Sequence, residues 1–247
     1  MAVIISRAFY VYTAPAIQIW IALIPGMFAI AFAKAKITRT LEPHAPSPRA
    51  ILSELKAPGA VLLSLLLFFQ MGNEWAIAGW LALFLSQRLG MSPPAAIMVL
   101  AVYWMALLFG RVAAQWILPR VRHTRMLMAS AGVSMFACLV LLSTDNQFGA
   151  ISGVILLGIS FAPVYPLVVE RIGQRFPDYH PGFYNGIFSL ALVGGLLAPC
   201  TLGYFAWLID VRVVMGLPLL GSAMILLLLV LIWIEARLSP SARVTEP

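Results

Sequence analysis

The chain has 247 residues, of which 62% are hydrophobic and 10% are charged, and its mean hydropathy is +0.96. Soluble domains carry about 25% charged residues, so this composition excludes a soluble globular protein and indicates an integral membrane protein. The net charge is +7, but the basic residues are scattered among short connections and form no continuous basic stripe. We therefore expect a lipid bilayer as the surroundings and no nucleic-acid partner.

Seven apolar runs are long enough to cross a bilayer as helices, which requires about 20 residues at about 1.5 Å rise each. They cover residues 14–33, 59–86, 94–118, 126–143, 148–169, 183–209 and 213–234. The expected fold class is an all-α membrane protein with seven transmembrane helices.

Lysine and arginine are distributed unevenly among the connections between these runs. Placing connections 34–58, 119–125 and 170–182 and the tail after residue 234 on one side gives that side 12 of the 16 Lys and Arg residues. Because positive loops stay in the cytoplasm, we expect a cytoplasmic carboxy terminus. The expected location is a bacterial inner (plasma) membrane.

The longest connection, residues 34–58, contains Pro43, Pro46 and Pro48 in a polar setting, which is typical of a flexible linker. Residues 53–56 are expected to form a short interfacial helix within it. The predicted organisation is a leading transmembrane helix (1–33), a cytoplasmic linker loop (34–58), a six-helix block (59–236) and a cytoplasmic tail (237–247).

Glu74 lies near the middle of the apolar run 59–86, close to the expected bilayer midplane. An acidic side chain there costs about 2.5–3.5 kcal/mol, so we expect it to face protein or water. Either it carries protons or binds a polar solute, or it is a buried carboxyl bonded to a neighbouring helix. Gln70, Asn73 and Glu74 stand at positions i, i+3 and i+4 and therefore share one expected helix face. Gln70 and Asn73 either bind solute hydroxyls or bridge helices.

Other runs also carry polar and aromatic residues at membrane depth. Candidates to line a solute cavity are Trp80, Tyr103, Trp104, Tyr165 and Asn185, since aromatic faces stack on sugar rings and amides bind hydroxyls. For each aromatic residue the alternative is a place in the core or in the interfacial belt. Pro163 and Pro166 remove two amide donors, so they are expected to kink or open the fifth run.

The residues that usually serve catalysis or metal binding are sparse. Cys138 and Cys200 lie inside apolar runs, and the three histidines lie in connections without partners at ligand spacing. Glu74 is the one carboxylate at mid-depth, whereas an intramembrane enzyme needs paired acids or histidines. We therefore expect no cofactor, no metal site, no disulfide framework and no enzyme.

Three segments carry a resemblance: GNEWAIAGWL (72–81), YWMALLFGR (103–111) and GISFAPVYP (158–166). Together they resemble the carboxy-terminal half of the major facilitator superfamily, and most of all its fucose-permease-like sugar/proton symporters. In that group the seventh helix carries a G-x-E-x-x-x-x-x-W segment and the eighth helix ends in Gly-Arg. The similarity covers residues 59–234, and the run before it looks like the sixth helix of the family.

The resemblance implies a secondary active transporter, or its carboxy-terminal half, that moves a small polar solute such as a sugar by alternating access. Gating by Gly110 and Arg111 follows from the same resemblance. Proton coupling through Glu74 is expected from its burial at mid-depth, and a gating role of Pro163 and Pro166 is expected from the broken helix they cause. The cytoplasmic motif of the family includes an acidic residue, which is absent here between residues 110 and 125. An alternative role for Arg111 is an ion pair with Glu170, which also lies at an expected cytoplasmic helix end.

Family members have twelve helices, and their solute site lies between two halves. This chain supplies one half and one further helix, so the implied partner is a second subunit or a missing amino-terminal half. Two other functions stay open. One is a seven-helix membrane receptor, although no lysine lies in run 213–234 to hold retinal. The other is a non-transporting remnant of a transporter.

Overall fold

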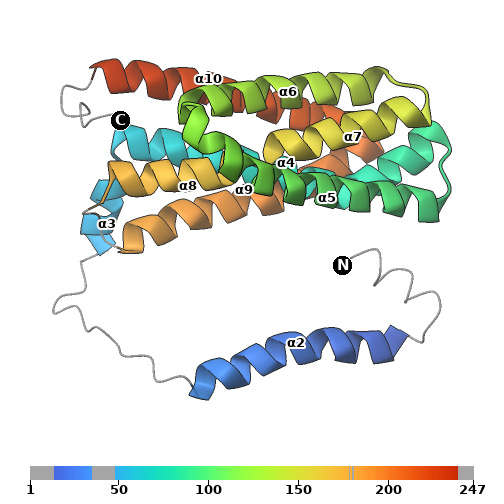
Figure 1. The fold of residues 1–247 in the computed structure, drawn as a ribbon, viewed down its shortest axis with the longest axis horizontal. Coiled ribbons are helices and arrows are strands. Elements are labelled where there is room, and N and C mark those ends of the chain that lie inside the picture. The colour runs from blue at the N-terminus through green and yellow to red at the C-terminus, as the bar shows by residue number, and fades with distance from the viewer. Residues whose placement is uncertain (1–13, 35–47, 178, 180, 239–247) are drawn as a thin grey trace. The chain divides into compact units, whose positions relative to one another are not determined.

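A computed structural model describes residues 14–34, 48–177, 179 and 181–238, and it divides the chain into two units, residues 1–45 and 46–247. The described part of the first unit is helix α2, Ala14–Lys34, which contains Pro25 (Figure 1). A helix therefore occupies the first apolar run. That it crosses a membrane as a seventh span stays a prediction.

The described part of the second unit is helical throughout and contains no strand. Its elements are α3 (Pro48–Leu55), α4 (Pro58–Leu89), α5 (Pro93–Ile117), the 3₁₀ turn η1 (Leu118–Arg120), α6 (His123–Ser143), α7 (Gln147–Phe161), α8 (Val164–Arg175), α9 (Pro181–Leu208) and α10 (Val213–Leu238). Among the described residues, six stretches are long and apolar enough to cross a membrane. These six correspond to the last six predicted runs.

The helix ends follow local chemistry. Pro58 and Pro93 stand in the first turns of α4 and α5, where the missing amide proton is not needed. Helix α4 stops at Gly90, whose φ of 62° favours glycine and whose N–H donates to the Leu85 carbonyl. At the start of α7 the Asn146 side chain accepts a hydrogen bond from the Gly149 amide at 2.7 Å.

Three segments differ from their sequence-based predictions. Residues 170–175 belong to helix α8, so the predicted connection 170–182 begins too early. Helix α10 continues to Leu238, beyond the predicted end of the last run at residue 234. The short linker helix is α3, which starts at Pro48 and therefore takes in the expected helix 53–56 except for Lys56.

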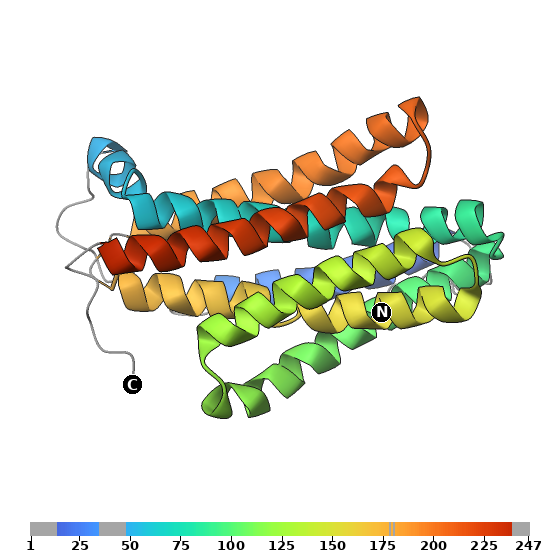
Figure 2. The ribbon, with the colours of Figure 1, turned by 90° about the horizontal axis from the view of Figure 1, so that it is seen from above.

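The long helices of the second unit lie side by side along one axis, as two perpendicular views show (Figures 1 and 2). Helix α4 packs mainly against α9 and α10, while α7 packs mainly against α5 and α6. Helices α4, α5 and α6 can be matched in chain order with α7, α9 and α10. Under this matching the pair α4–α9 corresponds to α7–α5, and the pair α4–α10 corresponds to α7–α6. The packing therefore has an internal three-helix repeat that was not apparent in the sequence.

Glycines allow the closest approach at both equivalent crossings. A Cβ atom on Gly194 of α9 would meet the backbone of Phe68 in α4, with the carbonyl carbon at 2.8 Å. In the other pair, a Cβ atom on Gly158 of α7 would lie 2.7 Å from the Tyr103 carbonyl oxygen of α5. Such contacts hold membrane helices together by van der Waals packing, because lipid supplies no hydrophobic driving force between them.

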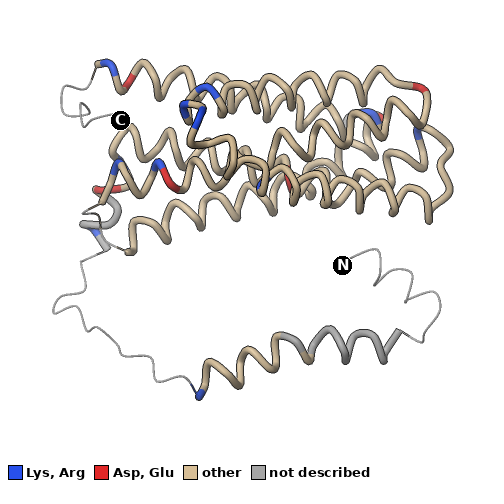
Figure 3. Tube along the Cα trace, viewed as in Figure 1, with Lys and Arg blue, Asp and Glu red and all other residues tan. Residues whose placement is uncertain are grey.

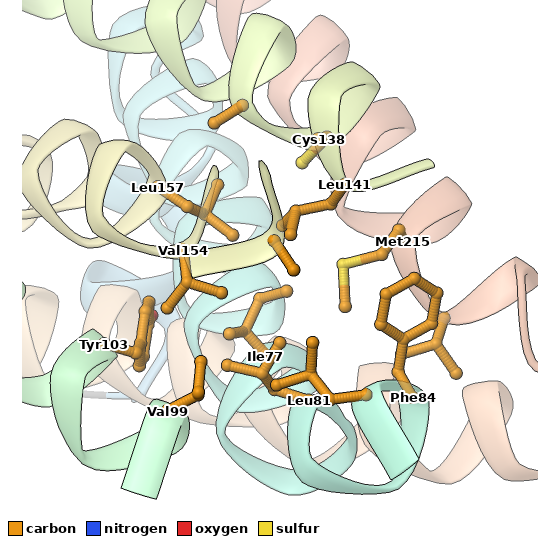
Figure 4. Packing of buried hydrophobic residues seen from close by; sticks show 14 of the residues in the cluster. Ile77, Leu81, Phe84, Val99, Tyr103, Cys138, Leu141, Val154, Leu157 and Met215 are labelled. Atoms are coloured by element: carbon orange, nitrogen blue, oxygen red, sulfur yellow. The ribbon is translucent and has the colours of Figure 1, made fainter. Parts of the chain in front are cut away.

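Two apolar clusters fill the bundle, one at each end of α4. Leu63, Leu66 and Leu67 belong to the first cluster, with residues of α8, α9 and α10. Ile77, Leu81 and Phe84 belong to the second, which Figure 4 shows together with Val99, Tyr103, Cys138, Leu141, Val154, Leu157 and Met215. The segment between the two clusters carries Gln70, Asn73 and Glu74, all of them buried.

Candidate functional site

Glu74 lies inside the bundle, between the two apolar clusters, and only 6% of its surface is exposed. The side-chain amide nitrogen Nε2 of Gln70 donates a 2.8 Å hydrogen bond to its Oε1 atom. Its other oxygen, Oε2, lies 3.6 Å from the guanidinium nitrogen Nη2 of Arg111 on α5. A buried charge needs such partners, since an unpaired carboxylate in an apolar interior is strongly unfavourable.

Arg111 connects this buried carboxylate to the outside of the bundle. Its side chain is 43% exposed, whereas that of Glu74 is 7% exposed. Charged residues elsewhere in the described chain mostly lie at or near the ends of the helices (Figure 3). The alternative pairing of Arg111 with Glu170 is wrong for this structure, because the Glu170 carboxylate accepts a hydrogen bond from Gln174 instead.

Gln70 has a second acceptor within reach. Its Nε2 atom lies 3.4 Å from the carbonyl oxygen of Phe161, the last residue of α7. Its Oε1 atom is buried and has no hydrogen-bond partner in the described chain. A single amide group therefore joins the carboxylate of α4 to the end of α7.

The chain breaks its helix beside this contact. Helix α7 ends at Phe161 and α8 begins at Val164, so the two prolines interrupt the fifth run as predicted. Pro163 and Pro166 have no N–H to donate to the carbonyls of Ile159 and Ala162. Among the described backbone hydrogen bonds, none reaches the Phe161 carbonyl across the break.

Asn73 and Trp80 connect α4 to other helices. The Nδ2 atom of Asn73 lies 3.4 Å from the hydroxyl oxygen of Ser222 on α10, so this amide contacts a different helix from that of Gln70. The indole N–H of Trp80 donates a 3.0 Å hydrogen bond to the Pro199 carbonyl of α9. In this structure both residues bridge helices.

The remaining candidates differ in exposure. Tyr103 is fully buried in the second apolar cluster, and its hydroxyl has no hydrogen-bond partner in the described chain. Trp104 beside it is 41% exposed and its ring meets that of Tyr103 edge to face. Tyr165 is half-buried at the start of α8, and Asn185 is exposed in the second turn of α9. The structure thus brings Gln70, Glu74 and Arg111 into contact. Of the aromatic candidates, Tyr103 lies close enough to interact electrostatically with both Glu74 and Arg111.

Sequence reasoning missed two partners in this region, Ser222 of α10 and the Phe161 carbonyl. Ser222 is the one polar residue of the apolar stretch 217–234, which is a usable signal. A carbonyl next to a helix-breaking proline is a second such signal, because the break frees an acceptor.

A separate groove of about 540 Å³ lies on the surface of α5 and α7. Its lining is apolar and includes Met98, Met105, Phe109, Ile155 and Ile159. Since it offers no hydrogen-bonding side chains, it does not suit a polar solute. Within the described residues, no group of three His, Cys, Asp or Glu side chains could hold a metal ion.

The fold resembles solved transporters. The fucose:proton symporter FucP of Escherichia coli, in a variant form, matches with a TM-score of 0.69 and 18% identity, over 88% of this chain and 54% of that protein. FucP in its outward conformation gives a TM-score of 0.67 over the same shares. The POT family transporter PepTSo gives 0.62 with 15% identity, over 82% of this chain and 39% of that one.

Sequence comparison points the same way. An uncharacterised MFS-type transporter of Yersinia pestis is 26% identical over 156 residues, which are 63% of this chain and 41% of the relative. The chain therefore spans about half the length or less of the proteins that it matches. The family model described as Major Facilitator Superfamily matches residues 2–199 and, in a second alignment, residues 63–246. Because these matches cover most of the sequence, the chain belongs to the Major Facilitator Superfamily.

Proposed function

We propose that this chain forms the carboxy-terminal wall of a secondary active transporter that moves a small polar solute, such as a sugar, together with protons by alternating access. The observation that carries the proposal is the buried Glu74 carboxylate, bonded to Gln70 and facing the partly exposed Arg111. Ion pairs of this kind inside membranes mark ion and proton pathways.

Glu74 is the proton carrier in this proposal. Its carboxylate is buried, but Arg111 extends from it to the surface of the bundle, so a proton has a polar route inward. When Glu74 is protonated, the attraction to Arg111 disappears and the guanidinium is free to turn toward a solute hydroxyl or water. The charge of Glu74 therefore controls the position of the Arg111 side chain.

The solute site is proposed on the wall that α4, α5, α8 and α9 contribute. Its residues are Glu74, Asn73, Gln70, Trp80, Tyr103, Trp104, Tyr165 and Asn185. Trp104 is exposed on this half, which supports direct solute contact for it. Asn185 is also exposed, but it lies nearer to α3, since a Cβ atom on the adjacent Gly186 would be 2.7 Å from Leu55. The helix bridges of Asn73 and Trp80, and the burial of Tyr103, suit roles in shaping the wall.

Gating is proposed at two places. Gly110 lies against α7, where a Cβ atom would be 2.7 Å from that of Ala162, so Arg111 follows directly after a close helix contact. Pro163 and Pro166 provide the broken helix that alternating access requires. Movement at the break would therefore shift α8 relative to the α5–α7 pair.

The opposite wall is proposed to come from a second subunit or from an amino-terminal half outside this sequence. The proposed organisation of the chain is the one predicted from its sequence: a leading transmembrane helix (1–33), a linker loop (34–58), a six-helix transporter half (59–236) and a cytoplasmic tail (237–247). The membrane proposed is the bacterial inner membrane.

Uptake by cells that express the full assembly, this chain together with its opposite wall, tests this function. Labelled hexoses and pentoses are supplied with and without an inward proton gradient, and counterflow exchange is measured separately. Glu74→Gln should abolish gradient-driven uptake and leave exchange measurable. Glu170→Gln is the matched control, because Glu170 also accepts a hydrogen bond from a glutamine four residues away but lies on the exposed surface.

Gradient-driven uptake that survives in Glu74→Gln would contradict the proposed proton role. Absence of both uptake and solute binding in the unaltered full assembly would instead favour the non-transporting remnant.

A further inference from the structure

The side-chain amide of Gln70 lies between two hydrogen-bond acceptors. One is the carboxylate of Glu74 on its own helix, and the other is the Phe161 carbonyl at the end of α7. Both are acceptors, so they require the nitrogen of the amide to lie between them. The amide oxygen is consequently left without a partner inside the bundle.

We propose that Gln70 is the positioning residue that couples the charge of Glu74 to the break between α7 and α8. The inference rests on the function proposed for Glu74 and adds the route by which a proton changes helix geometry. While Glu74 is ionised, Gln70 holds the Phe161 carbonyl, a group that no other described backbone donor serves.

Protonation of Glu74 reverses the requirement on this amide. The new O–H group of Glu74 is a donor and needs an acceptor, and the partnerless Oε1 atom of Gln70 is next to it on the same amide. Rotation of the amide by half a turn presents Oε1 to Glu74. Glu74 gains one proton. The rotation then replaces the hydrogen bond that Gln70 donates to Glu74 by one that the Glu74 O–H donates to Oε1 of Gln70.

The same rotation removes the donor from Phe161. Oε1 then stands where Nε2 stood, so two oxygens face each other and the Gln70–Phe161 contact is lost. The free carbonyl lies at a point where Pro163 and Pro166 have already removed two helical hydrogen bonds. The break therefore loosens when Glu74 is neutral and tightens when it is ionised.

Among the groups near this contact, Glu74 is the one whose protonation sets the orientation of the Gln70 amide. Arg111 and Tyr103, both on α5, are the charged and titratable side chains that interact with it. Helix α7 has no titratable residue, and α9 contributes Tyr184, Cys200 and Tyr204 but no charged residue. Helix α8 contributes Tyr165, and the charged residues of α8 and α10 lie in the carboxy-terminal halves of those helices.

Hydrogen–deuterium exchange of the full chain in nanodiscs tests the coupling directly. Peptides that cover residues 157–168 are followed at pH 5.5 and pH 8.5, and rates are converted to protection factors to remove the intrinsic pH effect. We expect protection in the unaltered chain to fall on the order of fivefold at the lower pH, as the loss of one hydrogen bond implies.

Two variants separate coupling from general loosening. Gln70→Met keeps the length of the side chain and removes the amide, so protection should be low and independent of pH. Glu74→Gln cannot ionise, so its protection should also be independent of pH. Ser64→Ala is the matched control, because Ser64 is a buried polar residue of α4 that bonds only within its own helix, and it should keep the unaltered response.

The inference is overturned if protection in the unaltered chain does not change with pH, which needs no variant to fold. It is equally overturned if Gln70→Met keeps the full pH response. A pH response that depends on Gln70 in a chain without solute uptake would support the coupling and remove only the transport proposal. Proton-driven uptake, together with a pH response of amide exchange that does not depend on Gln70, would support the transport proposal and overturn the coupling.

Discussion

Replacing Gly194 by alanine should destabilise the bundle, and the structure supplies the reason. A Cβ atom at this position in α9 would meet the Phe68 carbonyl group of α4, with its carbon at 2.8 Å and the Phe68 Cα atom at 3.0 Å. All of these atoms belong to the backbone, so no rotation of a side chain relieves the clash. The two helices must separate.

The magnitude is obtained from a matched pair. Overpacking of this kind costs about 1–3 kcal/mol. Alanine also gains about 1 kcal/mol over glycine inside any helix. Gly132 in α6 has no atom within 4 Å of its would-be Cβ, so Gly132→Ala receives the gain without the clash. Because the gain cancels between the two variants, Gly194→Ala should be less stable than Gly132→Ala by about 1–3 kcal/mol.

The assay is unfolding in mixed micelles with increasing sodium dodecyl sulfate, followed by far-ultraviolet circular dichroism. Two further glycines make it a graded series, because the nearest atoms lie at 2.7 Å for Gly158 and 3.2 Å for Gly72. The expected order of destabilisation is Gly194, Gly158, Gly72 and then Gly132. If Gly194→Ala and Gly132→Ala agree within about 0.5 kcal/mol, the usual error of such differences, the packing argument is refuted.

Three other substitutions test contacts elsewhere in the bundle, by the same unfolding assay. Arg175→Met removes a half-buried guanidinium that bonds both oxygens of Glu235, and it should cost about 1.5–3 kcal/mol, with much of that loss shared by Glu235→Gln in a double-mutant cycle. Trp80→Phe loses one hydrogen bond between α4 and α9 and should cost about 1 kcal/mol. Arg88→Gln breaks a pair whose acid is 82% exposed, so its effect should stay below about 1 kcal/mol and vanish in high salt.

The sequence predicted the helices of the second unit because their signals are local. Length and hydropathy locate each apolar run, and Pro58, Gly90 and Pro93 mark helix ends by backbone chemistry alone. The break between α7 and α8 was predictable for the same reason, since proline acts on its own helix. The extra helical turns at Arg175 and Leu238 were missed because charged residues there resemble a connection.

Partners across helices were not predictable, because they depend on tilt and crossing point. Arg111 lies far from Glu74 in sequence, and its Glu170 alternative was chosen on the assumption that both lie at one membrane surface. In the structure α5 carries Arg111 deep enough to reach α4. Likewise, Asn73 follows Gln70 by three residues, but α10 lies on that side of α4 and Ser222 becomes its neighbour.

The placement of Glu74 follows from how the helices pair. Backbone-to-backbone contacts at Gly194 and Gly158 join α4 to α9 and α7 to α5, and such contacts resist sliding because no side chain can adjust. Glu74 and its partners lie between these pairs: Gln70 and Glu74 on α4, Arg111 on α5 and the Phe161 carbonyl on α7. A polar contact between two tightly joined pairs can change while the pairs stay whole. In the proposed coupling, a change in the charge of Glu74 therefore acts on the α7–α8 break, which Pro163 and Pro166 have already weakened, and not on the crossings at Gly194 and Gly158.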